Sequence, residues 1–325
     1  MKILNLHHNP KLLITMAALV LVAVLAVSCC SQRYETLNVD GTNRKYLLHV
    51  PSNLPANATV PLVLALHQFS DTPQGMQILT NFDAMADREG FIVAYPKGQW
   101  RIWRSGVNDD DRDLNFLLAL MDELEVRYPI DPARIYATGA SAGAMMIQRL
   151  ATHTDRLAAI APVMGSLSAD FPAAAPVPAP LPVLVMHGME DPVLPYEGGA
   201  ADGPHKSMFL SAHETAAFWA EANGCESEPV LDTDITDEHG TVLVNRYTWK
   251  TGTVPSDRSE TGLSLFSDPV DNTVFLYAVV GCGHSWPGHH SRYPAFIVGR
   301  SVPKPNASEI IWNFFQNKRN ISIYE

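Results

Sequence analysis

The turn at residues 139–143 constrains the fold of this chain more than any other feature. Its sequence, Gly-Ala-Ser-Ala-Gly, follows an apolar run at 134–138 and precedes a run typical of a helix at 144–150. A serine between two glycines at a strand-to-helix turn predicts a nucleophile elbow. There the serine oxygen points away from the backbone, and the glycines let strand and helix approach closely. Ser141 is therefore the candidate nucleophile.

Apolar runs of strand length alternate with amphipathic runs on both sides of this turn. Residues 61–67, 90–96, 158–164 and 182–186 predict buried parallel strands, with further strands at 242–249 and 273–280. The stretches 81–89, 113–124, 207–222 and 307–315 predict helices. Residues 34–39 and 44–50 predict a hairpin, and the Pro/Ala-rich segment 171–181 predicts a surface loop. This alternation predicts an α/β fold with a mostly parallel sheet flanked by helices, in a single domain over 34–325.

The first 28 residues resemble a signal peptide for export. Lys2 and Lys11 precede an apolar stretch at 12–27, which is shorter than the roughly 20 residues that span a bilayer. Cys29 then resembles the cysteine of a bacterial lipobox, although Ala26 stands where leucine is usual. We expect a lipoprotein-type signal at 1–28, lipidation of Cys29 and a short tether at 29–33, with the lipid bilayer as a partner. Plain secretion and an uncleaved anchor are the alternatives to a membrane-anchored lipoprotein in the periplasm or on the cell surface.

Charge and cysteine content narrow the functional classes. Removal of 1–28 leaves 21 basic against 34 acidic residues, an excess of negative charge that would repel nucleic acid. The cluster Asp109–Asp111 predicts a solvated helix cap, so we expect no metal and no cofactor. In an exported chain, Cys225 and Cys282 predict either one disulfide or two separate thiols.

Catalysis by a serine hydroxyl requires a base to take its proton and an acid to orient that base. On elbow-containing folds the order along the chain is serine, acid, histidine. Asp191 follows the predicted strand at 182–186, and His284 follows the one at 273–280, so both are expected at the carboxyl edge of the sheet. Glu190 is the alternative acid.

Backbone N–H groups near the serine are the expected donors to a tetrahedral oxyanion. The first is the N–H of Ala142, the residue after the nucleophile, and the second belongs to Gln68 or Phe69, after the strand at 61–67. His67 is expected to have a structural role.

Several further motifs carry a family resemblance in collinear order from about Arg44 to Phe315. The chain resembles the polyhydroxybutyrate depolymerase and feruloyl esterase family, including its exported lipoprotein members. The resemblance implies an α/β-hydrolase fold without a large lid domain, a triad of Ser141, Asp191 and His284, and cleavage of carboxylic esters through an acyl-enzyme. Gln68 and Ala144 depart from glycines that are common in the family. The motifs are His187-Gly188 with Asp191-Pro192, Asn223-Gly224-Cys225, and Gly283-His284-Ser285-Trp286-Pro287-Gly288.

Aromatic residues on loops suit an apolar cleft, and Trp286 is the one expected to contact substrate. Soluble feruloyl or acetyl esters and short polyhydroxyalkanoate oligomers are the expected substrates. An acyltransferase or peptidase on the same fold, and a surface binding lipoprotein without turnover, are the alternative functions.

Overall fold

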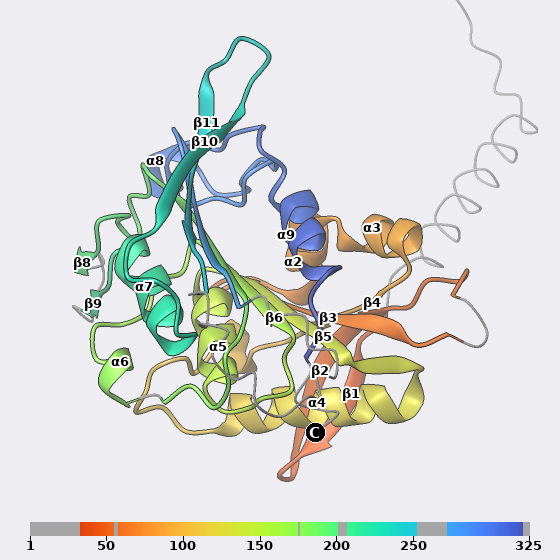
Figure 1. Cartoon of the computed structure of the whole chain (residues 1–325). Helices are drawn as coiled ribbons and strands as arrows, with labels where there is room; N and C mark the ends of the chain where they lie inside the picture. Colours follow the sequence, from red (N-terminus) through yellow and green to blue (C-terminus); the bar gives the residue numbers. More distant parts are fainter. Residues whose placement is uncertain (1–32, 55–57, 175, 201–206, 252–271, 321–325) are drawn as a thin grey trace, which may run out of the picture. The chain divides into compact units, whose positions relative to one another are not determined.

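The computed structural model describes residues 33–54, 58–174, 176–200, 207–251 and 272–320 (Figure 1). Glu35–Glu325 form one compact unit, and Met1–Tyr34 are assigned to a second. The expected signal peptide at 1–28 and Cys29 lie outside the described residues, so both stay predictions. No helix in the described part of the chain has the length and apolarity needed to cross a membrane.

A sheet of ten strands forms the centre of the described structure. Its order is β1-β2-β4-β3-β5-β6-β7-β12-β11-β10. The six strands from β4 to β12 pair in parallel, whereas β2 with β1 and β11 with β10 add antiparallel pairs at the two edges. The predicted, mostly parallel α/β sheet is therefore confirmed. The strands are β1 (Glu35–Val39), β2 (Thr42–His49), β3 (Val60–Leu66), β4 (Ile92–Pro96), β5 (Ile130–Ala140), β6 (Ala159–Val163), β7 (Val183–Gly188), β10 (Val230–Thr236), β11 (Val242–Trp249) and β12 (Val274–Val279).

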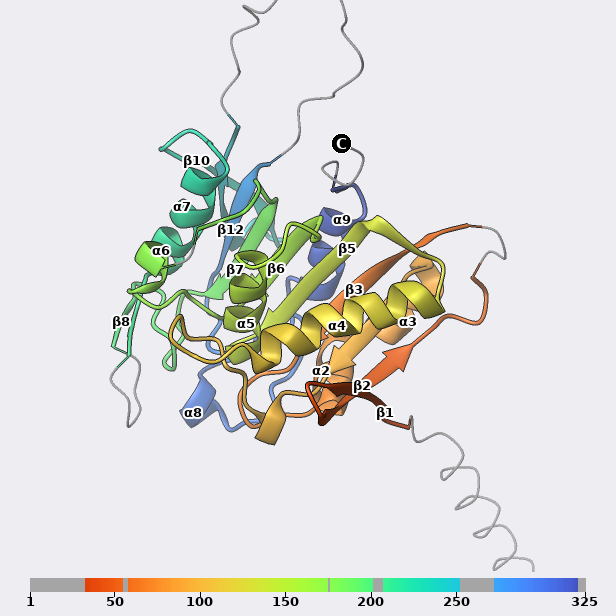
Figure 2. The ribbon, with the colours of Figure 1, turned by 90° about the horizontal axis from the view of Figure 1, so that it is seen from below.

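Helices cover both faces of this sheet. Figure 2 shows α4 and α5 in front of the strands, with α3 and α9 behind them. Strands β3, β4, β6 and β7 are buried on both faces, as their apolar sequences predict. The helices are α2 (Pro73–Thr80), α3 (Phe82–Glu89), η1 (Gln99–Arg101), α4 (Arg112–Arg127), α5 (Ala142–Ala151), α6 (Phe171–Ala174), α7 (Ala212–Ala222), α8 (Ala295–Val298) and α9 (Ala307–Phe315), and a separate small sheet pairs β8 (Gly199–Ala200) with β9 (Met208–Phe209).

Two predicted boundaries are wrong for identifiable reasons. The helix expected at 207–222 begins only at Ala212, because Ser211 and Glu214 form a reciprocal capping box at that point. The segment 171–181, predicted as a loop, begins with the short helix α6, whose Phe171 is buried against Phe218.

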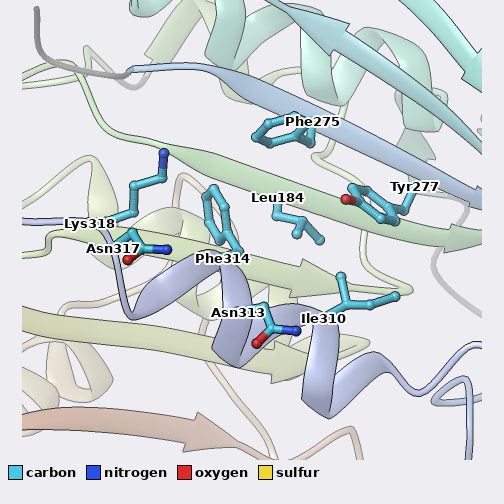
Figure 3. A pocket seen from close by; sticks show the side chains of 8 residues that line it. All are labelled: Leu184, Phe275, Tyr277, Ile310, Asn313, Phe314, Asn317 and Lys318. Atoms are coloured by element: carbon cyan, nitrogen blue, oxygen red, sulfur yellow. The ribbon is translucent and has the colours of Figure 1, made fainter. Parts of the chain in front are cut away.

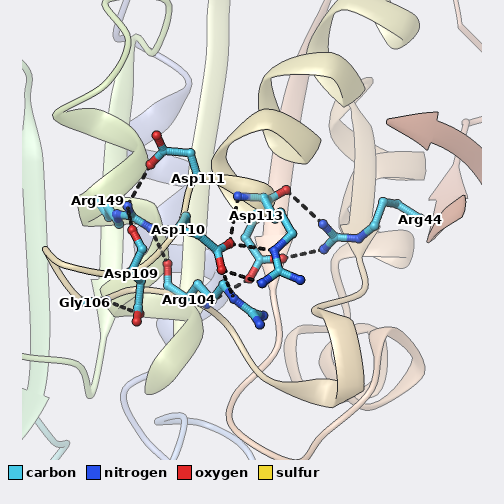
Figure 4. A network of polar contacts seen from close by, with 9 residues as sticks. Arg44, Arg104, Gly106, Asp109, Asp110, Asp111, Asp113 and Arg149 are labelled. Atoms are coloured by element: carbon cyan, nitrogen blue, oxygen red, sulfur yellow. Dashed lines mark hydrogen bonds and ion pairs between the residues drawn. The ribbon is translucent and has the colours of Figure 1, made fainter. Parts of the chain in front are cut away.

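The acidic cluster before α4 is exposed and lies at the helix N-terminus as predicted, where Asp110 Oδ1 accepts the N–H of Arg112, and it also forms ion pairs with arginines. Asp111 is the N-cap residue, but its side chain makes no capping bond and instead accepts from Arg149 at 2.9 Å. The Arg149 guanidinium also donates to the backbone carbonyls of Asp109 and Asp110 (Figure 4). The loop before α4 is therefore fastened to α5, the helix that follows the elbow.

Candidate active site

The elbow between β5 and α5 has the geometry that its sequence predicts. Ser141 has φ 53° and ψ −117°, a backbone conformation that is rare for a residue with a side chain. A Cβ on Gly139 would lie 2.5 Å from the carbonyl carbon of Gly143, and one on Gly143 would lie 2.4 Å from the carbonyl oxygen of Leu66. Glycine is therefore required at both positions, because strand, helix and neighbouring loop touch there.

Ser141, His284 and Asp191 form a continuous hydrogen-bonded chain. The distance from His284 Nε2 to Ser141 Oγ is 2.9 Å, and that from His284 Nδ1 to Asp191 Oδ2 is 2.7 Å. Asp191 and His284 follow β7 and β12, which are parallel neighbours in the sheet, so both loops leave the same edge. The structure thus brings together the three residues that the sequence singled out.

Asp191, and not Glu190, is the carboxylate that faces the histidine. Its Oδ1 accepts the backbone N–H groups of Val193 and Leu194 at 2.8 and 2.9 Å, which leaves Oδ2 directed at His284. Burial alone would raise the pKa of Asp191, but hydrogen bonds from His187 and His284 lower it below its usual value. The side chain is therefore a carboxylate at neutral pH, whereas Glu190 is exposed.

His187, which belongs to the motif His187-Gly188 but was given no role of its own, is a buried neighbour of Asp191. Its Nε2 donates to the carbonyl of Leu194 at 2.9 Å and lies 3.4 Å from Asp191 Oδ2. Leu194 in turn donates its N–H to Asp191 Oδ1, so the imidazole holds the loop that orients the carboxylate. The available signal was its position four residues before Asp191.

The loop after β3 lies beside the N-terminus of α5, as an oxyanion site requires. Burial lowers the pKa of His67, so its imidazole is neutral. The N–H of Gly98 donates to His67 Nε2 at 3.1 Å, which leaves the proton on Nδ1 to be donated to the carbonyl of Gln68 at 2.7 Å. Since the N–H of a trans peptide points opposite to its carbonyl, the N–H of Phe69 points away from His67. The N–H of Phe69 and that of Gln68 are thus both predicted candidates for the second donor, with the N–H of Ala142 as the first.

An ion pair connects the loop after β3 to the segment that follows His284. Both carboxylate oxygens of Asp71 lie 2.8 Å from Arg292 Nη2. Asp71 also accepts the N–H of Thr72 at the start of α2. Neither Asp71 nor Arg292 was singled out from the sequence, because 221 positions separate them.

Trp286 does not line the site, so the prediction that it contacts substrate is wrong. Its ring is fully buried, and its Nε1 donates to Ser308 Oγ at 3.1 Å. Ser308 Oγ donates to the carbonyl of Thr80 at 2.7 Å, so the ring joins the His284 loop to α9 and α2. Sequence adjacency to the histidine does not determine the direction of the ring.

Cys225 and Cys282 are separate thiols, the second of the two alternatives drawn from the sequence. Cys225 Sγ donates to the carbonyl of Asn272, before β12, whereas Cys282 follows the end of β12 and lies 3.4 Å from Ser285 Oγ. Six residues of strand span about 20 Å, well beyond the separation that a disulfide bridges.

A groove of about 380 Å³ lies between α9 and the strands β7 and β12 (Figure 3). Asn313 and Phe314 come from the helix, and Phe275 and Tyr277 from β12. None of its lining residues belongs to the loops of Ser141, His284 or Asp191, so the groove is distinct from the candidate active site. The complete lining is Leu184, Phe275, Tyr277, Ile310, Asn313, Phe314, Asn317 and Lys318.

Comparisons with known proteins bear on the family and the fold of the chain. No protein-family model matches the chain. The chain is 30% identical over 277 residues to "Putative esterase NocK" of Nocardia uniformis subsp. tsuyamanensis, covering 80% of this chain and 76% of that protein. It is 32% identical to poly(3-hydroxyalkanoate) depolymerase C of Paucimonas lemoignei over 44% of this chain, and 29% identical to feruloyl esterase B of Piromyces equi over 58% of it. In both cases the matched region spans 37% of the relative's own length.

The solved structure of acetyl xylan esterase from Aspergillus awamori matches 87% of this chain and 99% of its own. The TM-score is 0.56 and the sequence identity 16%, so this likeness concerns the fold. Together with the relatives, it shows that the chain belongs to the esterase family of the α/β-hydrolase fold that includes polyhydroxyalkanoate depolymerases and feruloyl and acetylxylan esterases, enzymes that act on carboxylic esters.

Proposed function

We propose that this esterase is an exported serine hydrolase that cleaves carboxylic esters through an acyl-enzyme. The observation that carries the proposal is the pair of hydrogen bonds joining Ser141 Oγ to His284 and His284 to Asp191. A neutral imidazole whose Nδ1–H is held by a carboxylate presents Nε2 as the acceptor for the serine proton.

In the first half of the reaction, Ser141 Oγ attacks the ester carbonyl carbon while its proton passes to His284 Nε2. The carbonyl oxygen becomes an oxyanion that the N–H groups of Ala142 and of Gln68 or Phe69 stabilise. Collapse of the tetrahedral intermediate breaks the bond to the alcohol, which leaves with the proton from His284. Asp191 keeps its negative charge throughout and stabilises the transient imidazolium.

In the second half, a water molecule takes the place of the alcohol. His284 removes one proton from this water as its oxygen attacks the acyl carbonyl carbon. The second tetrahedral intermediate then releases the carboxylic acid and returns the proton to Ser141 Oγ. The enzyme is restored without any cofactor.

Labelling with a fluorophosphonate probe tests this mechanism, because such probes modify an activated serine. The wild type should be labelled and should hydrolyse 4-nitrophenyl acetate, and Ser141→Ala should abolish both. A Ser141→Ala variant that is still labelled and still active would show that another group is the nucleophile. A wild type that is neither labelled nor active would favour a binding protein.

Export and membrane attachment through Cys29 belong to the same proposal. Their support is the sequence of residues 1–29, with its two lysines, apolar stretch and small residues before the cysteine. Incorporation of radiolabelled palmitate into the expressed protein should occur in the wild type and be lost in Cys29→Ser. Equal labelling of the two would refute lipidation at this residue.

We further propose feruloyl-type or acetyl-type esters and short hydroxyalkanoate oligomers as the substrate range. The named relatives include a feruloyl esterase and a polyhydroxyalkanoate depolymerase, which supports this range. Rates measured on methyl ferulate, acetylated xylan and hydroxybutyrate oligomers would rank these classes. A chain that cleaves none of them would refute the assigned range.

A further inference from the structure

The carboxylate of Asp191 is surrounded by four nitrogen atoms, and His187 supplies one of them. Oδ1 accepts the backbone N–H groups of Val193 and Leu194, and Oδ2 lies 2.7 Å from Nδ1 of His284. His187 Nε2 lies 3.4 Å from the same Oδ2, a long but direct contact. A carboxylate offers about four acceptor positions, so these four N–H groups together allow the side chain one orientation.

His187 also acts on the other carboxylate oxygen, through the peptide groups of Leu194. The carbonyl of Leu194 accepts from His187 Nε2 at 2.9 Å, and the N–H of the same residue donates to Asp191 Oδ1 at 2.9 Å. One N–H group of His187 is therefore directed both at the loop that holds Oδ1 and at Oδ2. Loss of this N–H would release both oxygens.

The imidazole of His187 is itself held by the centre of the sheet. It lies near the end of β7, which is placed between β6 and β12 (Figure 2), and it pairs with Ala278 of β12. Its side chain is fully buried, and the ring of Tyr196 packs against it at a centroid distance of 6.1 Å and an angle of 71°. His187 therefore offers a fixed point from which a loop can be held, and its burial keeps it out of contact with an ester.

The contacts of His187 determine which ring nitrogen carries the proton. Nε2 faces two oxygen atoms, so it is the donor. Nδ1 is buried and has no hydrogen-bond partner within the described part of the chain, so a second proton there would create a charged donor without an acceptor. The ring is therefore neutral. A neutral donor leaves the negative charge of Asp191 in place, and the proposed mechanism needs this charge to stabilise the imidazolium of His284.

We propose that His187 is a positioning residue of the triad, whose Nε2–H holds the Asp191 carboxylate in the orientation that serves His284. The inference rests on the proposed serine mechanism and assigns His187 a part in turnover as well as in folding. Because His187 acts through Asp191, its loss should lower kcat and leave KM nearly unchanged.

The first test compares three replacements of His187 in steady-state hydrolysis of 4-nitrophenyl acetate. Leucine has no N–H, glutamine places an amide N–H₂ about as far from the backbone as imidazole Nε2, and asparagine carries the same amide one methylene shorter. In His187→Leu and His187→Asn, kcat should fall about 10- to 100-fold, the effect of one buried hydrogen bond to a charged group. In His187→Gln it should stay within about three-fold of the wild type. KM should change less than about two-fold in all three.

A double-mutant cycle separates a role through Asp191 from a contribution to stability alone. In the Asp191→Asn background the carboxylate no longer serves His284, so His187→Leu should lower the remaining kcat by less than about two-fold. The free energy of unfolding should fall in both backgrounds, because the carbonyl of Leu194 loses its donor in each.

His213→Leu is the matched control for the loss of an imidazole. His213 lies on α7 and packs against the rings of Tyr196 and Tyr247, and the described residues show no contact between it and the triad. Its replacement should leave kcat within about two-fold of the wild type. If His187→Leu does not fold, the comparison of His187→Gln with His187→Asn decides, since both carry the same amide.

The outcomes distinguish this proposal from the proposed function. An unchanged kcat in His187→Leu, a glutamine variant no more active than the asparagine variant, or an equal loss of kcat in both backgrounds would overturn the role of His187 and leave the serine mechanism intact. A wild type that neither cleaves the ester nor reacts with the fluorophosphonate probe would overturn the proposed function itself.

Discussion

Replacing Asp191 by asparagine tests the triad most directly, because the structure determines how the new amide must sit. The Oδ1 of Asp191 accepts two backbone N–H groups, from Val193 and Leu194, and an amide can replace this oxygen only with its own carbonyl. The amide N–H₂ then faces His284 Nδ1, where two donors cannot bond. The imidazole therefore moves its proton to Nε2 and can no longer accept one from Ser141. We expect kcat to fall about 10⁴-fold, which corresponds to a loss of about 5 kcal/mol of transition-state stabilisation.

The assay is steady-state hydrolysis of a soluble ester, with thermal unfolding measured on the same samples. Asp191→Asn keeps the size of the side chain and the two N–H bonds of the loop, so the protein should still fold cooperatively; its melting temperature should fall, because the favourable interaction of the carboxylate with His187 and His284 is lost. Glu190→Gln is the matched control at the next residue, and we expect its kcat within about two-fold of the wild type, because the Glu190 side chain is exposed. If Asp191→Asn retains a tenth of the activity, or if Glu190→Gln is the crippled variant, the assignment of the acid is wrong.

Three further predictions concern stability, pH and the thiols. Arg44→Met leaves the buried carboxylate of Asp113 without the guanidinium that lies 2.5 Å from it. The free energy of unfolding, measured by denaturant titration, should therefore fall by about 3–5 kcal/mol. An unchanged free energy of unfolding would contradict the importance of this ion pair. The pKa of Asp191 is lower in the fold than its usual 3.8, so its stabilising contribution is present above that pH and is lost as the pH falls below it. The free energy of unfolding of Asp191→Asn should accordingly change less between pH 4 and pH 2 than that of the wild type. If the two proteins lose stability in parallel over this range, the lowered pKa of Asp191 is refuted. Burial raises the pKa of Cys282, so iodoacetamide should modify the half-buried Cys225 first in the native protein, and both thiols in denatured, unreduced protein; a cross-linked peptide containing both would contradict the structure.

Much of the central sheet was predictable, because a strand that is buried on both faces has a continuous run of apolar residues in the sequence. The strands β3, β4, β6 and β7 are apolar throughout, and each was predicted within one or two residues. Strand β10 was missed, because it pairs only with β11 at the edge and carries the polar sequence Asp-Thr-Asp. Helix α2 was missed as well, although Thr72 as an N-cap followed by Pro73 is a recognisable start signal.

The site was predictable to the extent that backbone constraints are local. The elbow of Ser141 depends on glycines two residues away, so the pentapeptide alone contains its geometry. The contacts of His187 with Leu194 and of Asp71 with Arg292 depend on side-chain directions across loops, for which the sequence has no comparable signal. Trp286 shows the same limit, since its ring turns away from the neighbouring histidine.

The convergence of Asp191 and His284 depends on the register of two strands that the chain reaches far apart in sequence. Between β7 and β12 the chain forms α7 and the antiparallel strands β10 and β11, and it then returns so that Val279 pairs with Gly188. A slip of one residue would move His284 by about 3.3 Å, more than the 2.9 Å that separates it from Ser141 Oγ. Close packing opposes such a slip, because a Cβ on Gly188 would lie 2.3 Å from the carbonyl oxygen of Cys282. Gly188 therefore lets the backbone of the acid loop touch that of the base loop, and Gly283 lets the base loop pack against the backbone of Val298 and Gly299. These two contacts hold the imidazole between carboxylate and serine.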